Sequence, residues 1–184
     1  MHRIMPVTAL ALSLSLVGVR DLLAQRSGFI VGFGIGAGVT TYTLSRDFSP
    51  DSDQGTNVGF ATDFKIGAQV SQSVQVYYLG RTNWSGTDRN EAVAAGISAL
   101  GVTYVLPSAP VHLSGGIGLA SWIPICIECS GFDAVVGIGL TGGVGWEFAD
   151  LWLLDFALTY GRPSTTERHV DMFLARVGIS ILSH

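Results

Sequence analysis

Residues 151–161 read LWLLDFALTYG, and their side chains alternate in character from one position to the next. One set is large and apolar, and consists of Trp152, Leu154, Phe156, Leu158 and Tyr160. The other set is mostly smaller and includes one acid, and consists of Leu153, Asp155, Ala157, Thr159 and Gly161. Because successive side chains of a β-strand point to opposite faces, this period of two predicts a strand with two different faces.

Residues 132–148, FDAVVGIGLTGGVGWEF, repeat the pattern over a longer distance. One face carries large apolar side chains, and the other is mostly glycine with the isolated acids Asp133 and Glu147. The solvent face of a soluble sheet would instead be rich in Lys, Glu and Arg. A bulky apolar face opposite a small, weakly charged face predicts a barrel whose outside meets lipid and whose inside is narrow and polar.

The composition agrees with a membrane β-barrel. Hydrophobic residues make up 48% of the 184 residues and charged residues only 13%, against about 25% charged in an average soluble domain. No internal run of about 18 apolar residues occurs, which argues against a helical membrane span and leaves a β-barrel or a very apolar soluble β-protein. The net charge of −4 argues against nucleic-acid binding.

The N-terminus has the layout of a secretory signal. Arg3 precedes a short apolar run over 7–19, and the alternating body follows. We therefore predict a signal peptide over 1–24 and an outer-membrane β-barrel domain over 25–184. A permanent N-terminal anchor is the alternative, for which the apolar run is short.

The alternation predicts one all-β domain, an eight-stranded antiparallel up-and-down transmembrane β-barrel. The expected strands are 28–42, 57–69, 73–83, 92–106, 110–121, 132–148, 151–161 and 168–182. Long polar connections, the first of them 43–56, alternate with short ones such as 149–150. Outer-membrane barrels have long loops outside and short turns in the periplasm, so both termini are expected in the periplasm.

Two further features test this assignment. Outward aromatic residues should form two girdles, with Phe29, Tyr104, Trp146, Phe148 and Trp152 near the periplasmic end, and Phe60, Phe132, Tyr160 and Phe173 near the outer end. In 92–106 the apolar parity changes, from Val93, Ala95 and Ile97 to Leu100, Val102 and Tyr104. We interpret this change as a β-bulge near Ser98, with a helix that begins after Asn90 as the alternative.

Charged residues on the inward parity form the candidate site. A Lys or Arg that faces lipid at the midplane costs about 2–4 kcal/mol, whereas charges in the lumen can be paired. We expect a polar lumen network of Asp63, Lys65, Glu147, Asp155 and Arg176. This network could serve only to fill the interior, act as a gate, or carry acid–base chemistry. Inward glycines on two walls would leave room for long side chains to cross, because eight strands enclose a narrow interior.

Cys126 and Cys129 form a lone C-x-x-C motif. In an exported protein a local disulfide is the first expectation, with free thiols and a redox or metal motif as alternatives. The glycines of 137–142 match G-x-G-x-x-G but lack a βαβ setting, and 51–57 lacks the ligands of a calcium loop. We predict no catalytic, cofactor-binding or metal site.

Over residues 26–182 the chain resembles the small outer-membrane β-barrels of Gram-negative bacteria, the OmpA/OmpX-type and broader porin-like barrel family. The resemblance lies in the alternation, girdles, loop rhythm and signal layout, and in 173–181, which look like the family's C-terminal assembly signal. It implies the bacterial outer membrane, contact with membrane lipid and lipopolysaccharide, and structural, adhesive or small-pore roles. A monomer is expected, and no extracellular or periplasmic partner can be named.

The function predicted first is a non-enzymatic outer-membrane barrel with a largely plugged lumen and a structural or surface-interaction role. A narrow channel for small or apolar solutes is the first alternative. A lipid-modifying enzyme would depend on His169, with Ser164, Thr165, Thr166 and Glu167 close to it in sequence. A soluble lipocalin-like carrier would place the large apolar residues inside and a charged surface outside.

Overall fold

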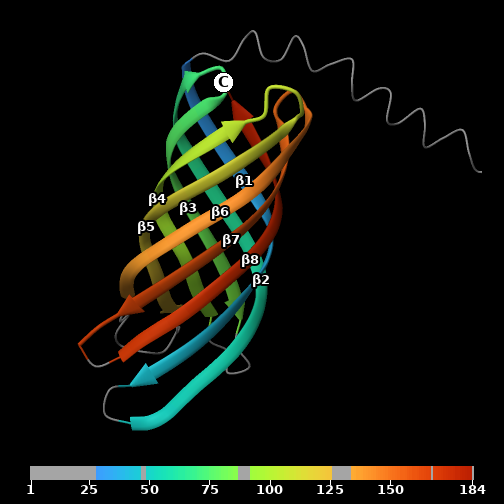
Figure 1. Cartoon of the computed structure of the whole chain (residues 1–184). Coiled ribbons are helices and arrows are strands. Elements are labelled where there is room, and N and C mark those ends of the chain that lie inside the picture. Colours follow the sequence, from blue (N-terminus) through green and yellow to red (C-terminus); the bar gives the residue numbers. More distant parts are fainter. Residues whose placement is uncertain (1–27, 47–48, 87–91, 126–133, 167, 184) are drawn as a thin grey trace, which may run out of the picture.

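The computed structural model describes residues 28–46, 49–86, 92–125, 134–166 and 168–183. Within these ranges the chain forms eight strands, which are, in chain order, β1 (Gly28–Arg46), β2 (Ser49–Ser71), β3 (Val74–Gly86), β4 (Ala92–Val105), β5 (Val111–Ile125), β6 (Val135–Ala149), β7 (Trp152–Ser164) and β8 (Arg168–Ser183). Each strand pairs antiparallel with the next, and β8 pairs with β1, so that the sheet closes into a barrel (Figure 1). The predicted eight-stranded antiparallel barrel is confirmed. No helix in these ranges is long and apolar enough to cross a membrane.

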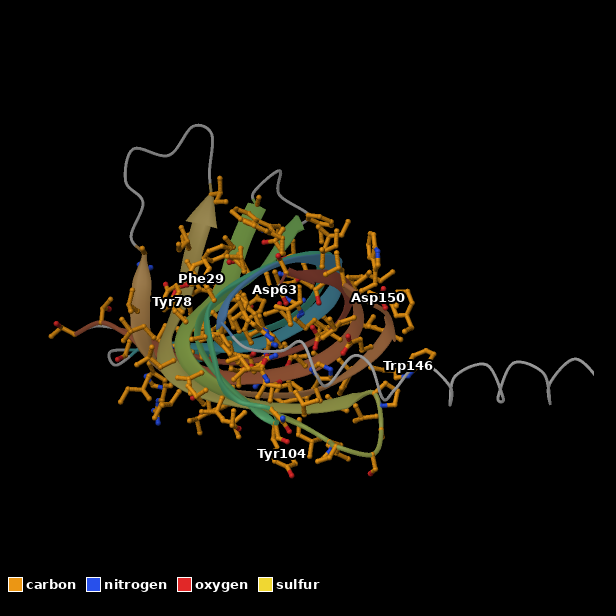
Figure 2. All side chains as sticks on the ribbon, turned by 90° about the horizontal axis from the view of Figure 1, so that it is seen from above. Phe29, Asp63, Tyr78, Tyr104, Trp146 and Asp150 are labelled. Atoms are coloured by element: carbon orange, nitrogen blue, oxygen red, sulfur yellow. The ribbon has the colours of Figure 1, made fainter. Side chains whose placement is uncertain are left out.

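The two faces of the wall are oriented as the alternation predicts. Outward side chains are large, apolar and exposed, such as Ile138 at 71% and Phe156 at 45%, whereas Asp155 is 6% exposed. Figure 2 shows Asp63 inside the ring of strands, while Tyr104 and Trp146 project from its outer side. The aromatic residues predicted for the girdles are exposed on the outer face wherever the structure describes them. A soluble lipocalin-like carrier requires the reverse arrangement, so that alternative is wrong.

The first long loop was predicted wrongly. Residues 43–46 and 49–56 belong to β1 and β2, which pair in register as far as Ser45 and Ser52. The resulting hairpin projects beyond the rest of the barrel at the end opposite the C-terminus (Figure 1). Polar residues dominate these positions because this part of the sheet lies outside the apolar band, so their polarity did not distinguish a strand from a loop.

The predicted β-bulge near Ser98 is also wrong. β4 pairs with β3 and β5 over its whole length without a register shift. Val93, Ala95 and Ile97 are buried and point inward, whereas Leu100 is 68% exposed and points outward. The apolar parity changes because this part of the lumen is itself apolar, and the strand continues regularly through Ser98.

Candidate functional site

A carboxylate held by two guanidinium groups lies in the middle of the lumen. Asp63 on β2 accepts a hydrogen bond of 2.6 Å from Arg176 Nη2 on β8, and its Oδ2 lies 3.8 Å from Arg81 Nε on β3. The three side chains are 11%, 7% and 4% exposed, respectively. Hydrogen bonds between ionised groups are strong, and burial makes the loss of either partner costly.

Glycines on β1 allow Arg176 to reach Asp63. The two residues lie on strands that flank β1, and the inward positions of β1 between them are Gly34, Gly36 and Gly38. A Cβ on Gly34 would stand 3.1 Å from Asp63 Cγ. A Cβ on Gly36 would stand 2.6 Å from the Gly178 Cα at the β1–β8 closure. The bare wall of β1 therefore makes room for the ion pair and for close packing of the strands.

Arg81 extends further, toward the opposite wall. Its Nη1 donates a 2.9 Å hydrogen bond to Thr141 Oγ1 on β6, which also accepts one of 3.0 Å from Thr159 on β7. The Arg81 side chain therefore crosses the lumen from β3 to β6. Arg81 was not among the residues predicted for the polar lumen network, because β3 and β6 are not adjacent strands.

The other residues of the predicted polar network make separate contacts. Lys65 Nζ lies 4.5 Å from the centroid of the Tyr77 ring, and Asp155 accepts a 3.0 Å hydrogen bond from Ser180. Asp63, Lys65 and Asp155 all line one cavity of about 10 Å³. Glu147 pairs with His112 at 3.1 Å, with both residues buried. The structure thus joins Asp63 to Arg176 directly, and the functional role of the five residues stays a prediction.

Apolar side chains lie on both sides of this charged cluster. Toward the β1–β2 hairpin, the Tyr42 ring on β1 and the Trp122 ring on β5 have centroids 4.6 Å apart. Because β1 and β5 are opposite strands in the ring, this contact spans the lumen. The buried residues around it are Val93, Ala95, Ala120, Val170, Met172 and Leu174. Toward the other end, a second buried cluster consists of Ile30, Tyr77, Leu79, Ile97, Ala99, Leu153 and Leu182.

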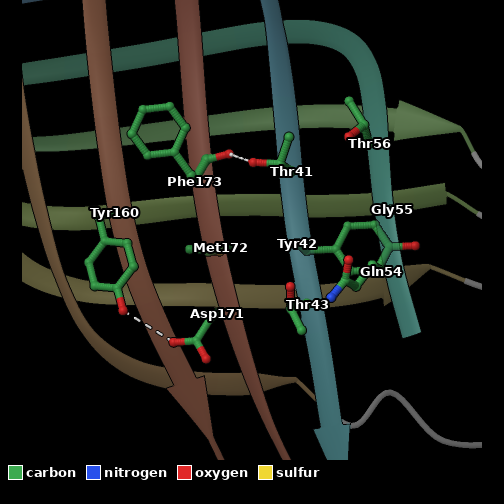
Figure 3. A pocket seen from close by; sticks show the side chains of 10 residues that line it. All are labelled: Thr41, Tyr42, Thr43, Gln54, Gly55, Thr56, Tyr160, Asp171, Met172 and Phe173. Atoms are coloured by element: carbon green, nitrogen blue, oxygen red, sulfur yellow. Dashed lines mark hydrogen bonds between the residues drawn. The ribbon is translucent and has the colours of Figure 1, made fainter. Parts of the chain in front are cut away.

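The outer wall carries a groove at the hairpin end of the barrel. Figure 3 shows it on β1, β2, β7 and β8, and its volume is about 550 Å³. Its lining residues are Thr41, Tyr42, Thr43, Gln54, Gly55, Thr56, Tyr160, Asp171, Met172 and Phe173. Asp171 accepts a 3.1 Å hydrogen bond from the Tyr160 hydroxyl, lies 3.5 Å from Arg162 Nε, and lies 3.9 Å from His169 Nε2. No sequence pattern indicates this groove, because its residues lie on four strands and have no common spacing.

Other predicted residues lie at the rim or outside the described ranges. Ser164 lies opposite His169 in the β7–β8 pairing, and the Thr165 hydroxyl donates a 3.4 Å hydrogen bond to the Arg168 carbonyl. The predicted residues that lie outside the described ranges are Cys126, Cys129, Phe132, Asp133 and Glu167, and the predicted signal peptide over 1–24 also lies outside them. The disulfide and its alternatives therefore stay predictions.

Comparison with solved structures finds the same architecture in bacterial outer-membrane proteins. Neisserial surface protein A matches with a TM-score of 0.55 at 15% identity, over 81% of this chain and 96% of that chain. Ail, the attachment invasion locus protein of Yersinia pestis, matches with a TM-score of 0.53 at 11% identity, over 85% of this chain and 100% of that chain. No protein-family model and no curated protein sequence matches the chain.

At these identities the likeness establishes the fold. The apolar exterior band and the charged interior are features of this chain's own wall. The chain thus has the fold of the small eight-stranded outer-membrane β-barrels.

Proposed function

We propose that the protein is a non-conducting, non-enzymatic outer-membrane barrel that acts through its outer rim and outer wall. The observation that carries the proposal is the occlusion of the lumen at two successive levels. The Tyr42–Trp122 contact spans it near the hairpin end, and Arg81 and Arg176 converge on Asp63 below that contact. A wall that is braced from inside is a rigid support for surface interactions.

The opposing hypothesis is a narrow channel for small or apolar solutes. A channel needs a continuous path through the lumen, and the apolar clusters and the arginine pair occupy successive levels of it. The cavity beside Lys65 and Asp155 measures about 10 Å³, which is room for about one water molecule. This size supports a plugged lumen.

Planar-bilayer recording tests the proposal. The wild-type protein is expected to give no steady ion-selective openings. A quadruple variant, Tyr42→Ala, Trp122→Ala, Arg81→Ala and Tyr77→Ala, removes large side chains at both of these levels and in the second apolar cluster, and it is expected to conduct. Steady openings of the wild-type protein would overturn the plugged-lumen proposal and favour the channel.

A matched control distinguishes the opening of the lumen from a general effect of removing aromatic side chains. Phe33 and Phe64 form an aromatic pair with centroids 5.0 Å apart, and Phe33 is 63% exposed on the outer face. The double variant Phe33→Ala and Phe64→Ala removes two rings from the wall without opening the lumen, so it is expected to remain silent. A heat-modifiability gel on each variant establishes that the barrel is folded before recording.

A further inference from the structure

The exterior changes from apolar to polar along a continuous boundary that crosses four neighbouring strands. The last apolar row is formed by the paired positions Leu158, Ala175, Val39 and Val58. The next outward row is Tyr160, Phe173, Thr41 and Thr56. The row beyond it on β8, β1 and β2 is Asp171, Thr43 and Gln54. The groove lies on the last two of these rows.

The position of the groove matches the interface between acyl chains and polar heads. Tyr and other aromatic residues collect at headgroup level in membrane proteins, where one end of the ring is apolar and the other is hydrated. Tyr160 and Phe173, 49% and 44% exposed, mark this level on β7 and β8. Val39, Val58 and Leu158 continue the wall as an exposed apolar surface below the groove. A ligand of the groove therefore has a polar part in it and an apolar part along the wall.

The lining chemistry identifies the polar part. Thr41, Thr43, Gln54 and Thr56 supply neutral hydroxyl and amide groups, and Asp171 supplies a carboxylate, so the groove suits a head rich in hydroxyl groups. At its edge the Arg162 side chain is 58% exposed, and its Nε lies 3.5 Å from Asp171 Oδ1. A guanidinium has five N–H donors in a fork that fits phosphate, so its outer donors can bind an anionic group on the same head.

We propose that this groove binds the phosphorylated sugar head of an outer-leaflet glycolipid of the lipopolysaccharide class. The sugar lies over the row of Thr43, Gln54 and Asp171, a phosphate faces Arg162, and acyl chains lie on the apolar row below. The volume of about 550 Å³ falls within the range of about 300–1,000 Å³ typical of ligand pockets. This proposal rests on the proposed function, because it identifies one partner of the outer wall.

Lipid retention on the full chain in nanodiscs, read by native mass spectrometry, tests the proposal. Purified lipid A competes with a diacyl phosphatidylglycerol, which has a phosphate and acyl chains but no sugar. The wild-type protein is expected to retain lipid A in preference. Asp171→Asn, and separately Thr43→Ala with Gln54→Ala, are each expected to lower lipid A retention about tenfold and to leave phosphatidylglycerol unchanged.

The control makes the same kind of substitution on the outer wall away from the groove. Thr82→Ala with Ser98→Ala removes two outward hydroxyls from β3 and β4 and is expected to retain lipid A as the wild type does. Equal retention of the two lipids by the wild type would overturn the proposal, as would wild-type retention by the folded Thr43→Ala, Gln54→Ala variant. Bilayer recording on the same protein distinguishes the two proposals. Channel openings would contradict only the proposal of a plugged lumen, and the absence of a preference for lipid A would contradict only the proposed lipid site in the groove.

Discussion

Replacing Asp63 with alanine is expected to lower the free energy of unfolding by about 3–5 kcal/mol, since it leaves buried charges without their partner. Arg176 and Arg81 both converge on this carboxylate, and both side chains are less than a tenth exposed. Removing Asp63 leaves two cations to repel each other across a narrow lumen. The measurement is equilibrium unfolding by denaturant in lipid vesicles, followed by tryptophan fluorescence.

Asp53→Ala is the matched control, because Asp53 is an exposed acid on the same strand. Its effect is expected to be within about 0.5 kcal/mol of zero. Adding Arg176→Met to Asp63→Ala removes one of the unpaired charges and is expected to restore part of the stability. Equal stability of the Asp63→Ala and Asp53→Ala proteins would contradict a stabilising role of the ion pairs that Asp63 forms with Arg176 and Arg81.

Placing a charge on the lipid-facing wall is the second large perturbation. Val177 is the middle of the five outward positions of β8 from Phe173 to Ile181, and it is 49% exposed. Val177→Arg is expected to destabilise the barrel by about 2–4 kcal/mol, because a guanidinium at the bilayer midplane loses hydration without gaining a partner. Unfolding in vesicles measures the effect.

The same substitution at the rim provides the comparison. Ser164 ends β7 beyond Tyr160 and is exposed, so Ser164→Arg is expected to cost about 0–1 kcal/mol. The depth dependence, rather than either value alone, identifies lipid as the solvent of this wall. If the two variants were destabilised equally, the outer face would not have the apolar environment that we assign to it.

Strand parity was predictable from the sequence because lipid and lumen select opposite side chains at alternate positions. That selection correctly put Asp155, Glu147 and Arg176 inside and Trp152 outside. The prediction of strand parity was wrong where the lumen is lined by apolar rather than polar residues. Around Val93 and Ile97 the lumen is apolar, so both faces of β4 carry apolar residues and a regular strand looked like one with a bulge.

The contacts inside the lumen were less predictable. Pairing between neighbouring strands follows from topology, but Arg176 reaches Asp63 across β1, and Arg81 reaches Thr141 across the lumen. Such contacts depend on the register of several strands and on which wall is bare. The inward glycines of β1 were the one sequence feature that indicated these contacts. Positions without side chains show where a long side chain from another strand can cross the lumen.

The outer groove left no signal in any single segment. Two of its lining residues, Thr43 on β1 and Asp171 on β8, are far apart in sequence and adjacent only because the barrel closes. Polar residues in these segments were read as loop or strand end, and only the closed sheet aligns them into rows. A site that spans the pairing of β1 with β8 can be predicted only when the register of these strands is known. Composition and periodicity do not determine that register.

Tryptophan quenching by brominated lipid tests the orientation of the wall most directly. Trp152 is 44% exposed on the outer face, and Trp122 is 7% exposed inside the barrel. Two proteins, each retaining one of these residues with the other tryptophans changed to phenylalanine, are reconstituted in vesicles with bromine on the upper acyl chain. Strong quenching of Trp152 and little quenching of Trp122 are expected, and the reverse order would contradict an outer face that contacts lipid.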